Sequence, residues 1–118
     1  MGVTNATELW GTIRKFVTNA SGVVVETPPS TGFDDLWHHT AVSIYDNQMD
    51  AASCTNAERV NTITHEMGHT LKLAHVGAGT YRVQALPSGS RSIMEADTRQ
   101  SFAPQQYDKN ELIYKWGV

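Results

Sequence analysis

Three histidines and a glutamate form the stretch of the chain with the clearest chemical content. Residues 64–75 contain H-E-x-x-H, and a third histidine follows ten residues after the first. On a helix, His65 and His69 lie about 40° apart around the axis and one turn apart along it, so both imidazoles can reach one ion. Glu66 lies at the rim of that face, where it is better placed to contact a metal-bound water than to ligate the metal.

His75 adds a geometric condition. On a continuous helix it would lie roughly 15 Å along the axis from His65, whereas zinc–nitrogen bonds are only about 2.0–2.1 Å long. Either His75 is not a ligand, or the helix ends near Lys72 and the chain reverses. The second alternative reproduces the spacing H-E-x-x-H-x-x-G-x-x-H, with Lys72 at the glycine position. A positive φ at Lys72 would cost on the order of 1 kcal/mol, which a folded domain tolerates.

This spacing resembles the metzincin metallopeptidases, and the resemblance extends from about residue 42 to residue 117. It implies a zinc ion held by His65, His69 and His75, with a water in the fourth, exchangeable position. Glu66 would be the general base, taking the water's proton and delivering it to the departing amine. Met94 would lie in a tight turn beneath the metal, although a methionine can also simply fill the core. The resemblance therefore predicts a zinc-dependent endopeptidase that acts on peptides or proteins.

Other functions compete with this prediction. One is a zinc-stabilised binding or regulatory module with little or no general proteolytic activity, and another is a regulatory or toxin-type peptidase with one narrow substrate. A third is a helical domain without metal. Glu66 favours catalysis, because a purely structural zinc site has no use for a general base beside its ligands.

Length and composition predict one domain over residues 1–118. A chain of 118 residues with 40% hydrophobic content can bury one small core, and by the resemblance residues 1–75 form the upper part and 76–118 the lower part. The net charge of -3 and the pI near 5.9 argue against nucleic acid or an anionic membrane as a partner. No apolar run is long enough to span a membrane. We expect a monomer.

The cellular compartment is not decided by the sequence. The N-terminus lacks a basic segment followed by an apolar run, the mark of a signal peptide. Cys54 is the only cysteine, so no internal disulfide forms. The chain is either cytosolic or a mature secreted domain without its leader, and the second alternative is favoured.

The segments before the motif predict an α+β fold. Residues 5–20 show helical spacing of apolar side chains and predict an amphipathic helix ended by Gly22. Residues 23–27 and 41–45 predict strands, separated by a loop over 28–37. By the resemblance, the sheet is small and mixed, and the strand at 41–45 pairs with an extended substrate. Metzincin domains usually open with a strand, and none is evident here, so a shortened version is expected.

The motif helix should begin near Thr55. Thr55 and Glu58 have capping-box spacing. The apolar residues of this helix lie on the side opposite His65 and His69; they are Val60, Ile63, Met67 and Leu71. The pattern predicts a helix with an apolar core side and a polar ligand side.

The C-terminal segments predict an extended stretch at 81–86, a turn at 87–90 and a last helix ended by Gly117. This helix has two possible starts: Pro104 lies in its first turn, or Asp108 is the cap with Glu111 three residues later. This ending resembles the C-terminal helix of bacterial matrixin-like proteins.

Two further metal sites have weak support. His38 and His39 could bind a second metal, but a solvated pair at the start of a strand is favoured. The acidic residues at 34, 35, 46 and 50 could bind calcium, yet scattered loop acids are usually only solvated. Cys54 is expected to be a small, partly buried side chain.

Overall fold

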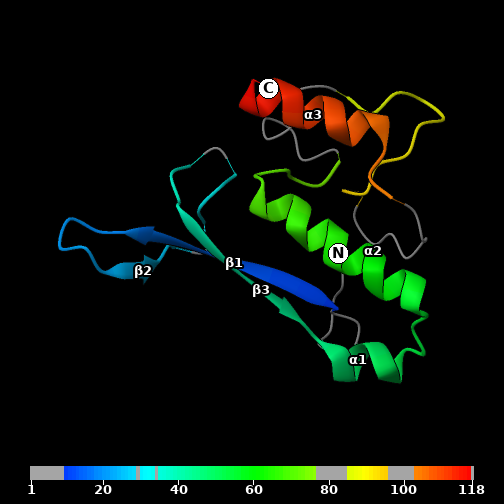
Figure 1. The fold of residues 1–118 in the computed structure, drawn as a ribbon, viewed down its shortest axis with the longest axis horizontal. Helices are drawn as coiled ribbons and strands as arrows, with labels where there is room; N and C mark the ends of the chain where they lie inside the picture. Colours follow the sequence, from blue (N-terminus) through cyan, green and yellow to red (C-terminus); the bar gives the residue numbers. More distant parts are fainter. Residues whose placement is uncertain (1–9, 29, 34, 77–84, 96–102, 118) are drawn as a thin grey trace.

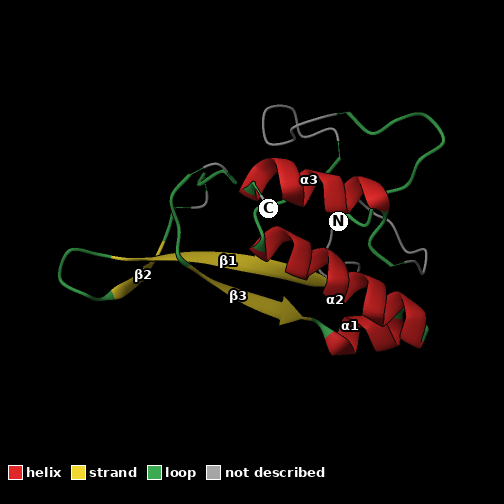
Figure 2. Cartoon of the chain, turned by 45° about the horizontal axis from the view of Figure 1, so that its top comes forward, coloured by secondary structure: helices red, strands yellow, loops and turns green. Residues whose placement is uncertain are grey.

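The computed structural model describes residues 10–28, 30–33, 35–76, 85–95 and 103–117. Over these residues the chain is a small α+β fold, a three-stranded antiparallel sheet followed by helices (Figure 1). Helix α2 lies between the sheet and α3 in both Figure 1 and Figure 2. The elements are β1 Gly11–Thr18, β2 Val24–Glu26, β3 His39–Ile44, α1 Asp46–Ala51, α2 Asn56–Thr70 and α3 Gln106–Trp116.

Strand β1 corrects the helix predicted over residues 5–20. It is the middle strand of the order β2-β1-β3 and pairs with β3 from Gly11↔Ile44 to Phe16↔His39. Four of its eight residues are β-branched, which favours a pleated strand once a partner strand is present. A short apolar run is compatible with both the helical and the strand period. The six residue pairs with β3 show that the segment is a strand. Residues 5–9 lie outside the described part of the chain.

The same strand overturns the expectation that no strand precedes the first helix. The strands predicted at 23–27 and 41–45 are confirmed as β2 and β3. The described strands pair only in antiparallel fashion, so the sheet they form is not mixed as predicted. The described residues of the segment 28–37 form no helix or strand, as expected.

Helix α2 begins where the sequence predicts. The Thr55 hydroxyl accepts a hydrogen bond from the Glu58 N–H at 3.1 Å, and the Glu58 carboxylate accepts one from the Thr55 N–H at 3.0 Å. The helix packs closely on β1, because a Cβ at Gly11 would stand only 2.9 Å from Cγ of Glu66. A residue without a side chain is therefore needed at this crossing.

The predicted burial of α2 is wrong, because the two sides of the helix are exchanged. Its polar and small side is buried, with Asn61, Thr62, His65, Glu66, Gly68 and His69 inside. The predicted core residues Val60, Ile63, Met67 and Leu71 are exposed instead. Small and polar side chains let the helix approach its neighbours closely, and hydrogen bonds offset the cost of burying polar groups.

Helix α3 confirms the predicted last helix and its end. Gly117 follows the helix in the left-handed conformation, with φ of 71°. Neither predicted start is correct, since the cap is Gln105 and Asp108 is the third helical residue, accepting a hydrogen bond from the Gln105 N–H at 2.8 Å. The indole of Trp116 donates to the Leu71 carbonyl at 2.9 Å, which joins the ends of α3 and α2.

Two further elements were predicted between the histidine motif and the last helix, a turn at 87–90 and an extended stretch at 81–86. The turn at 87–90 is confirmed by a hydrogen bond from the Ser90 N–H to the Pro87 carbonyl. Most of the stretch predicted as extended, 81–84, lies outside the described residues. Within the described part of the chain, every helix is too short or too polar to cross a membrane.

Candidate metal centre

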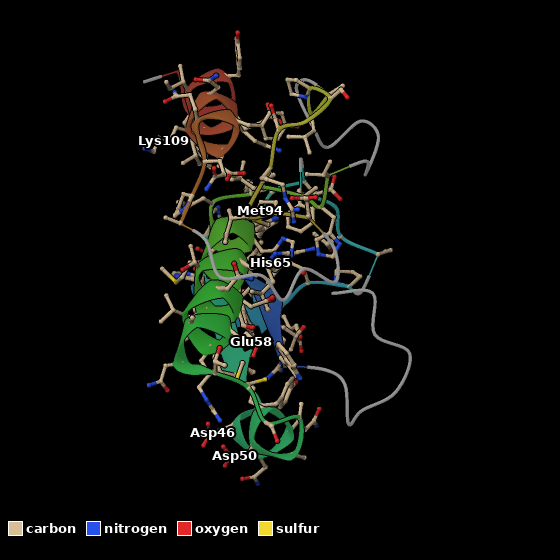
Figure 3. All side chains as sticks on the ribbon, turned by 90° about the vertical axis from the view of Figure 1, so that its right-hand side faces the viewer. Asp46, Asp50, Glu58, His65, Met94 and Lys109 are labelled. Atoms are coloured by element: carbon tan, nitrogen blue, oxygen red, sulfur yellow. The ribbon has the colours of Figure 1, made fainter. Side chains whose placement is uncertain are left out.

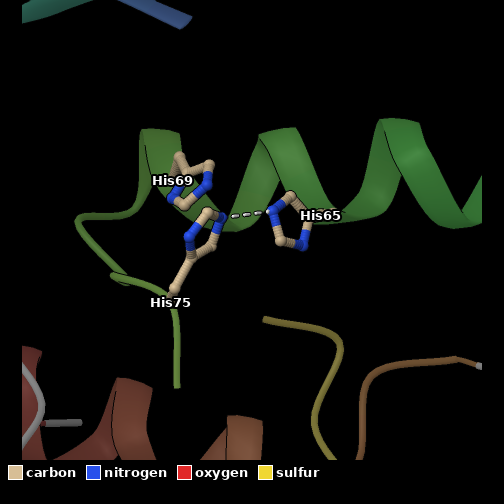
Figure 4. Close-up of side chains that lie close together, drawn as sticks. All are labelled: His65, His69 and His75. Atoms are coloured by element: carbon tan, nitrogen blue, oxygen red, sulfur yellow. Dashed lines mark hydrogen bonds between the residues drawn. The ribbon is translucent and has the colours of Figure 1, made fainter. Parts of the chain in front are cut away.

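The three histidines of the motif converge on one point. One ligand nitrogen from each of His65, His69 and His75 lies within 4.8 Å of the others. Nε2 of His65 faces Nε2 of His75 at 3.1 Å, the contact drawn in Figure 4. The first two come from successive turns of α2, and the third comes from the segment that follows the helix. Three imidazoles so arranged can hold a metal ion.

Lys72 makes this convergence possible. Its φ is 66°, so the chain leaves the helix at Leu71 and turns back instead of continuing along the axis. The predicted reversal at Lys72 is thus confirmed, including the positive φ. The Lys72 ammonium donates to the Asp35 carbonyl at 2.9 Å and lies 4.8 Å from the centre of the Trp37 ring. These contacts offset the strain of a left-handed lysine.

Backbone carbonyls fix the proton positions on two of the imidazoles. Nδ1 of His65 lies 2.7 Å from the Ile93 carbonyl oxygen, and Nδ1 of His69 lies 2.7 Å from the Leu73 carbonyl oxygen. Because a carbonyl oxygen only accepts, each Nδ1 carries the proton and each Nε2 keeps its lone pair. The donor set therefore fits a metal such as zinc, which prefers neutral imidazoles oriented in this way.

Burial keeps these histidines neutral. Desolvation lowers the pKa of His65 to about 4 and that of His69 to about 3, with the neighbouring His65 adding a smaller effect on His69. Both imidazoles are consequently uncharged at neutral pH, which is the form that binds a metal ion.

Glu66 directly follows His65 in α2 but is not one of the converging residues. Among the residues that the structure describes, the group of converging ligand atoms consists of the three histidines. The Glu66 side chain is 2% exposed and packs against Gly11 of β1. Burial raises its pKa to about 7. A carboxyl group of this kind holds or releases a proton near neutral pH.

A turn at residues 92–95 packs against α2. Met94 is fully buried, and its Sδ would stand only 2.3 Å from a Cβ at Gly68. Gly68 is therefore required in the helix, although glycine there costs about 1 kcal/mol relative to alanine. The predicted tight turn carrying Met94 is thus present, directly against the helix that carries two of the histidines.

Asp108 of α3 holds this turn in place. Its buried carboxylate accepts hydrogen bonds from the Ser92 hydroxyl at 2.5 Å and from the Ile93 N–H at 3.0 Å. The carbonyl of Ile93 is the partner of His65, so a chain of contacts links α3 to one imidazole. The sequence showed Asp108 only as a candidate cap, because a contact made across 15 positions leaves no local pattern.

Phe33 is a second neighbour that the sequence did not predict. Its ring stacks on His69 with the centres 5.2 Å apart and the planes 22° apart. The ammonium of Lys15 lies 4.5 Å from the centre of the Phe33 ring and donates to the Thr31 carbonyl at 2.7 Å. The loop composition of this segment gave no sign that one of its side chains would border the histidines.

The residues of the two weaker metal sites have other partners among the described residues. His38 and His39 are exposed and contact Thr18. Asp46 and Asp50 both pair with Arg59, and Asp35 accepts a hydrogen bond from the Gly32 N–H. Asp34 lies outside the described part, and Cys54 is half-buried as expected.

We compared the chain with protein families, curated proteins and solved structures. No protein-family model, curated protein or solved structure matches this chain. The fold and the site define a small α+β protein whose three-histidine cluster can bind a metal ion.

Proposed function

We propose that this chain is a zinc-dependent endopeptidase, with His65, His69 and His75 as metal ligands and Glu66 as general base. The observation that carries the proposal is the convergence of the three imidazoles, with ligand atoms within 4.8 Å, and the burial of Glu66, which directly follows His65 in α2. A closed structural site would fill its fourth position with another protein ligand. The cluster provides three ligands from the described residues, and we propose that water or substrate takes the fourth position.

A zinc ion held by these imidazoles would supply Lewis-acid polarisation of a peptide carbonyl and activation of a water molecule. Glu66 takes the proton of the attacking water and passes it to the leaving amine. Its pKa of about 7 suits a group that must first accept and then release a proton near neutral pH. The hydrogen bonds from Nδ1 of His65 and His69 to carbonyls keep both rings oriented.

The sheet offers a place for an extended peptide. Strand β3 is an edge strand among the described strands, so its outer backbone groups are available for pairing. Addition of a peptide strand to such an edge is a common recognition mode. This supports a peptide or protein substrate.

The first test is metal content, with and without His75. Protein purified without added metal should contain one zinc per chain, and His75→Ala should lower the zinc affinity by about 100-fold or more. Full-affinity binding by His75→Ala would remove this histidine from the site. Absence of any zinc binding would overturn the proposal.

The second test separates catalysis from binding. Glu66→Gln should retain zinc and lose about 100-fold or more of the hydrolysis of a peptide library, whereas Glu26→Gln, an exposed carboxylate on β2, should leave both unchanged. A zinc-loaded parent chain that cleaves no peptide would instead establish the zinc-stabilised binding module. The Phe33 ring stacked on His69 favours that second candidate, because it covers one face of this imidazole.

A further inference from the structure

An apolar surface runs along the side of the molecule opposite the histidines. It is made by Val60, Ile63, Met67 and Leu71 of α2 with Ile113 and Trp116 of α3, and we call it the outer apolar face. Each of these side chains is between 44% and 62% exposed. Half-exposed side chains of this size present together roughly 500–600 Å² of apolar surface. That is the upper limit of what a typical monomer leaves uncovered, so the face has the size of an interaction site.

The two helices meet at one end of this face. The hydrogen bond from the Trp116 indole to the Leu71 carbonyl joins them at their C-terminal ends. Between Arg59 and Lys72 the sequence of α2 carries only one formal charge, Glu66, and this residue is buried on the other side. About three turns of the helix therefore present no charge to solvent.

Charges of opposite sign border the two ends of this face. Asp46 and Asp50 pair with Arg59 near the start of α2, and Glu58 lies in the first turn of this helix. At the other end stands Lys109, which is exposed and shares the α3 stripe of Ile113 and Trp116. Figure 3 shows Asp46 and Asp50 at one end of the molecule and Lys109 at the opposite end.

We propose that the outer apolar face binds a second copy of this chain, with the two α2 helices antiparallel. A two-fold axis near the middle of α2 places Val60 against Leu71 of the other copy and Ile63 against Met67 of the other copy. The same rotation brings the acidic end of each chain to the Lys109 end of the other. A surface that is apolar at its centre and oppositely charged at its two ends is complementary to itself in this orientation.

This dimer differs from the monomer expected from the sequence. That expectation placed the apolar residues of α2 inside the domain, whereas the structure leaves them at the surface. The proposed interface lies on the side of α2 away from the histidines, so dimerisation does not depend on the metal. Failure of the zinc proposal would leave it standing.

Sedimentation equilibrium tests the proposal on the full chain, with and without zinc. We expect the mass to double between about 1 µM and 1 mM, as for an interface of modest size. Met67→Glu should weaken association by about 100-fold or more, because it buries a carboxylate twice in a symmetric interface. Val24→Glu is the matched control: Val24 is 51% exposed, as Met67 is, but belongs to β2, and its replacement should change nothing.

A charge exchange tests the orientation. Lys109→Asp alone should weaken association by about 3- to 10-fold at low salt, and adding Asp50→Lys should restore it. A chain that stays monomeric at about 1 mM, or a dimer that Met67→Glu leaves intact, would overturn the proposal. A monomer whose outer apolar face binds an unrelated protein would overturn it as well.

Discussion

The two sides of α2 contrast in composition, burial and bonding. The inner side is polar and buried, with His65, Glu66 and His69 inside and the histidine Nδ1 atoms paired with carbonyls. The outer side is apolar and exposed, with Met67 and Val60 more than half accessible. An ordinary amphipathic helix shows the opposite arrangement.

This inversion shows which contacts determine how α2 packs. Gly11 of β1 lets Glu66 approach the sheet, and Gly68 of the helix leaves room for the sulfur of Met94. Both contacts lie on the inner side and depend on close approach. Burial of the apolar stripe would require the helix to turn about its axis and give up these contacts together with the histidine hydrogen bonds. The arrangement of the site therefore takes precedence over hydrophobic patterning.

The largest expected effect compares two methionines on opposite sides of the helix. Met94→Ala should lower the free energy of unfolding by about 3 kcal/mol, because Met94 is fully buried and fills the space beneath Gly68. Met67→Ala should change it by less than about 0.5 kcal/mol, since Met67 is 51% exposed. Urea unfolding of dilute, metal-free protein measures both. Equal losses would show that the outer side is covered within the monomer.

The pH dependence of the metal-free protein tests the inner side. Between pH 6.5 and 4.5 the unfolded chain protonates His65 and His69, while the folded chain, with pKa values of about 4 and 3, does not. Glu66 acts in the opposite sense, because its folded pKa of about 7 lets the folded chain hold a proton that the unfolded chain lacks. The net difference is one proton, so stability should fall by about 1.4 kcal/mol per pH unit on acidification.

Variants separate the two contributions to this slope. Glu66→Gln removes the opposing proton, so the slope should approximately double, to about 2.7 kcal/mol per pH unit. His65→Ala should reduce the slope toward zero. Thermal melting at several pH values in the presence of a chelator gives the measurement. An unchanged slope in Glu66→Gln would mean that this carboxyl group titrates normally in the folded chain.

Asp108 gives a smaller and more local effect. Asp108→Asn replaces one accepting oxygen by an NH2 group that only donates, so the side chain can no longer accept from both Ser92 and Ile93. We expect a loss of about 2 kcal/mol in stability and about 10-fold in zinc affinity, since the Ile93 carbonyl orients His65. Asp50→Asn serves as the control, because Asp50 pairs with Arg59 at the surface, and it should leave zinc affinity unchanged. A loss of stability without any loss of zinc affinity would disconnect Asp108 from the site.

The sequence predicted the local features of the site well. Helix dimensions and bond lengths left two alternatives for His75, and the resemblance of the spacing to the metzincin motif favoured the convergence and the turn at Lys72 that the structure shows. The start of α2 followed from a capping box, a pattern confined to Thr55 and Glu58. Such predictions succeed because the residues that decide them are neighbours in the chain.

Features that depend on distant segments were not predicted. Residues 11–18 became a strand because 39–44 pair with them, and a helical period cannot reveal a partner. The inner side of α2 is chosen by Gly11 and Met94, which lie far from it in sequence. The contacts of Asp108 and Phe33 with the site also cross long separations. In each case the tertiary contact overrides the local pattern.

The smallest expected effect concerns Lys72, where the chain passes from the outer side of α2 to the inner cluster. Lys72→Gly removes about 1 kcal/mol of left-handed strain, but it also loses the contacts of the ammonium with Asp35 and Trp37 and loosens the unfolded chain. These terms nearly cancel, so stability should stay within about 1 kcal/mol and zinc affinity within about 3-fold.

Lys72→Val should lower zinc affinity much more than Lys72→Gly, because a β-branched residue is strongly disfavoured at a φ of 66° and the turn that carries His75 to the cluster would open. Isothermal titration of zinc into both variants gives the comparison. Equal affinities would mean that His75 reaches the cluster without this turn.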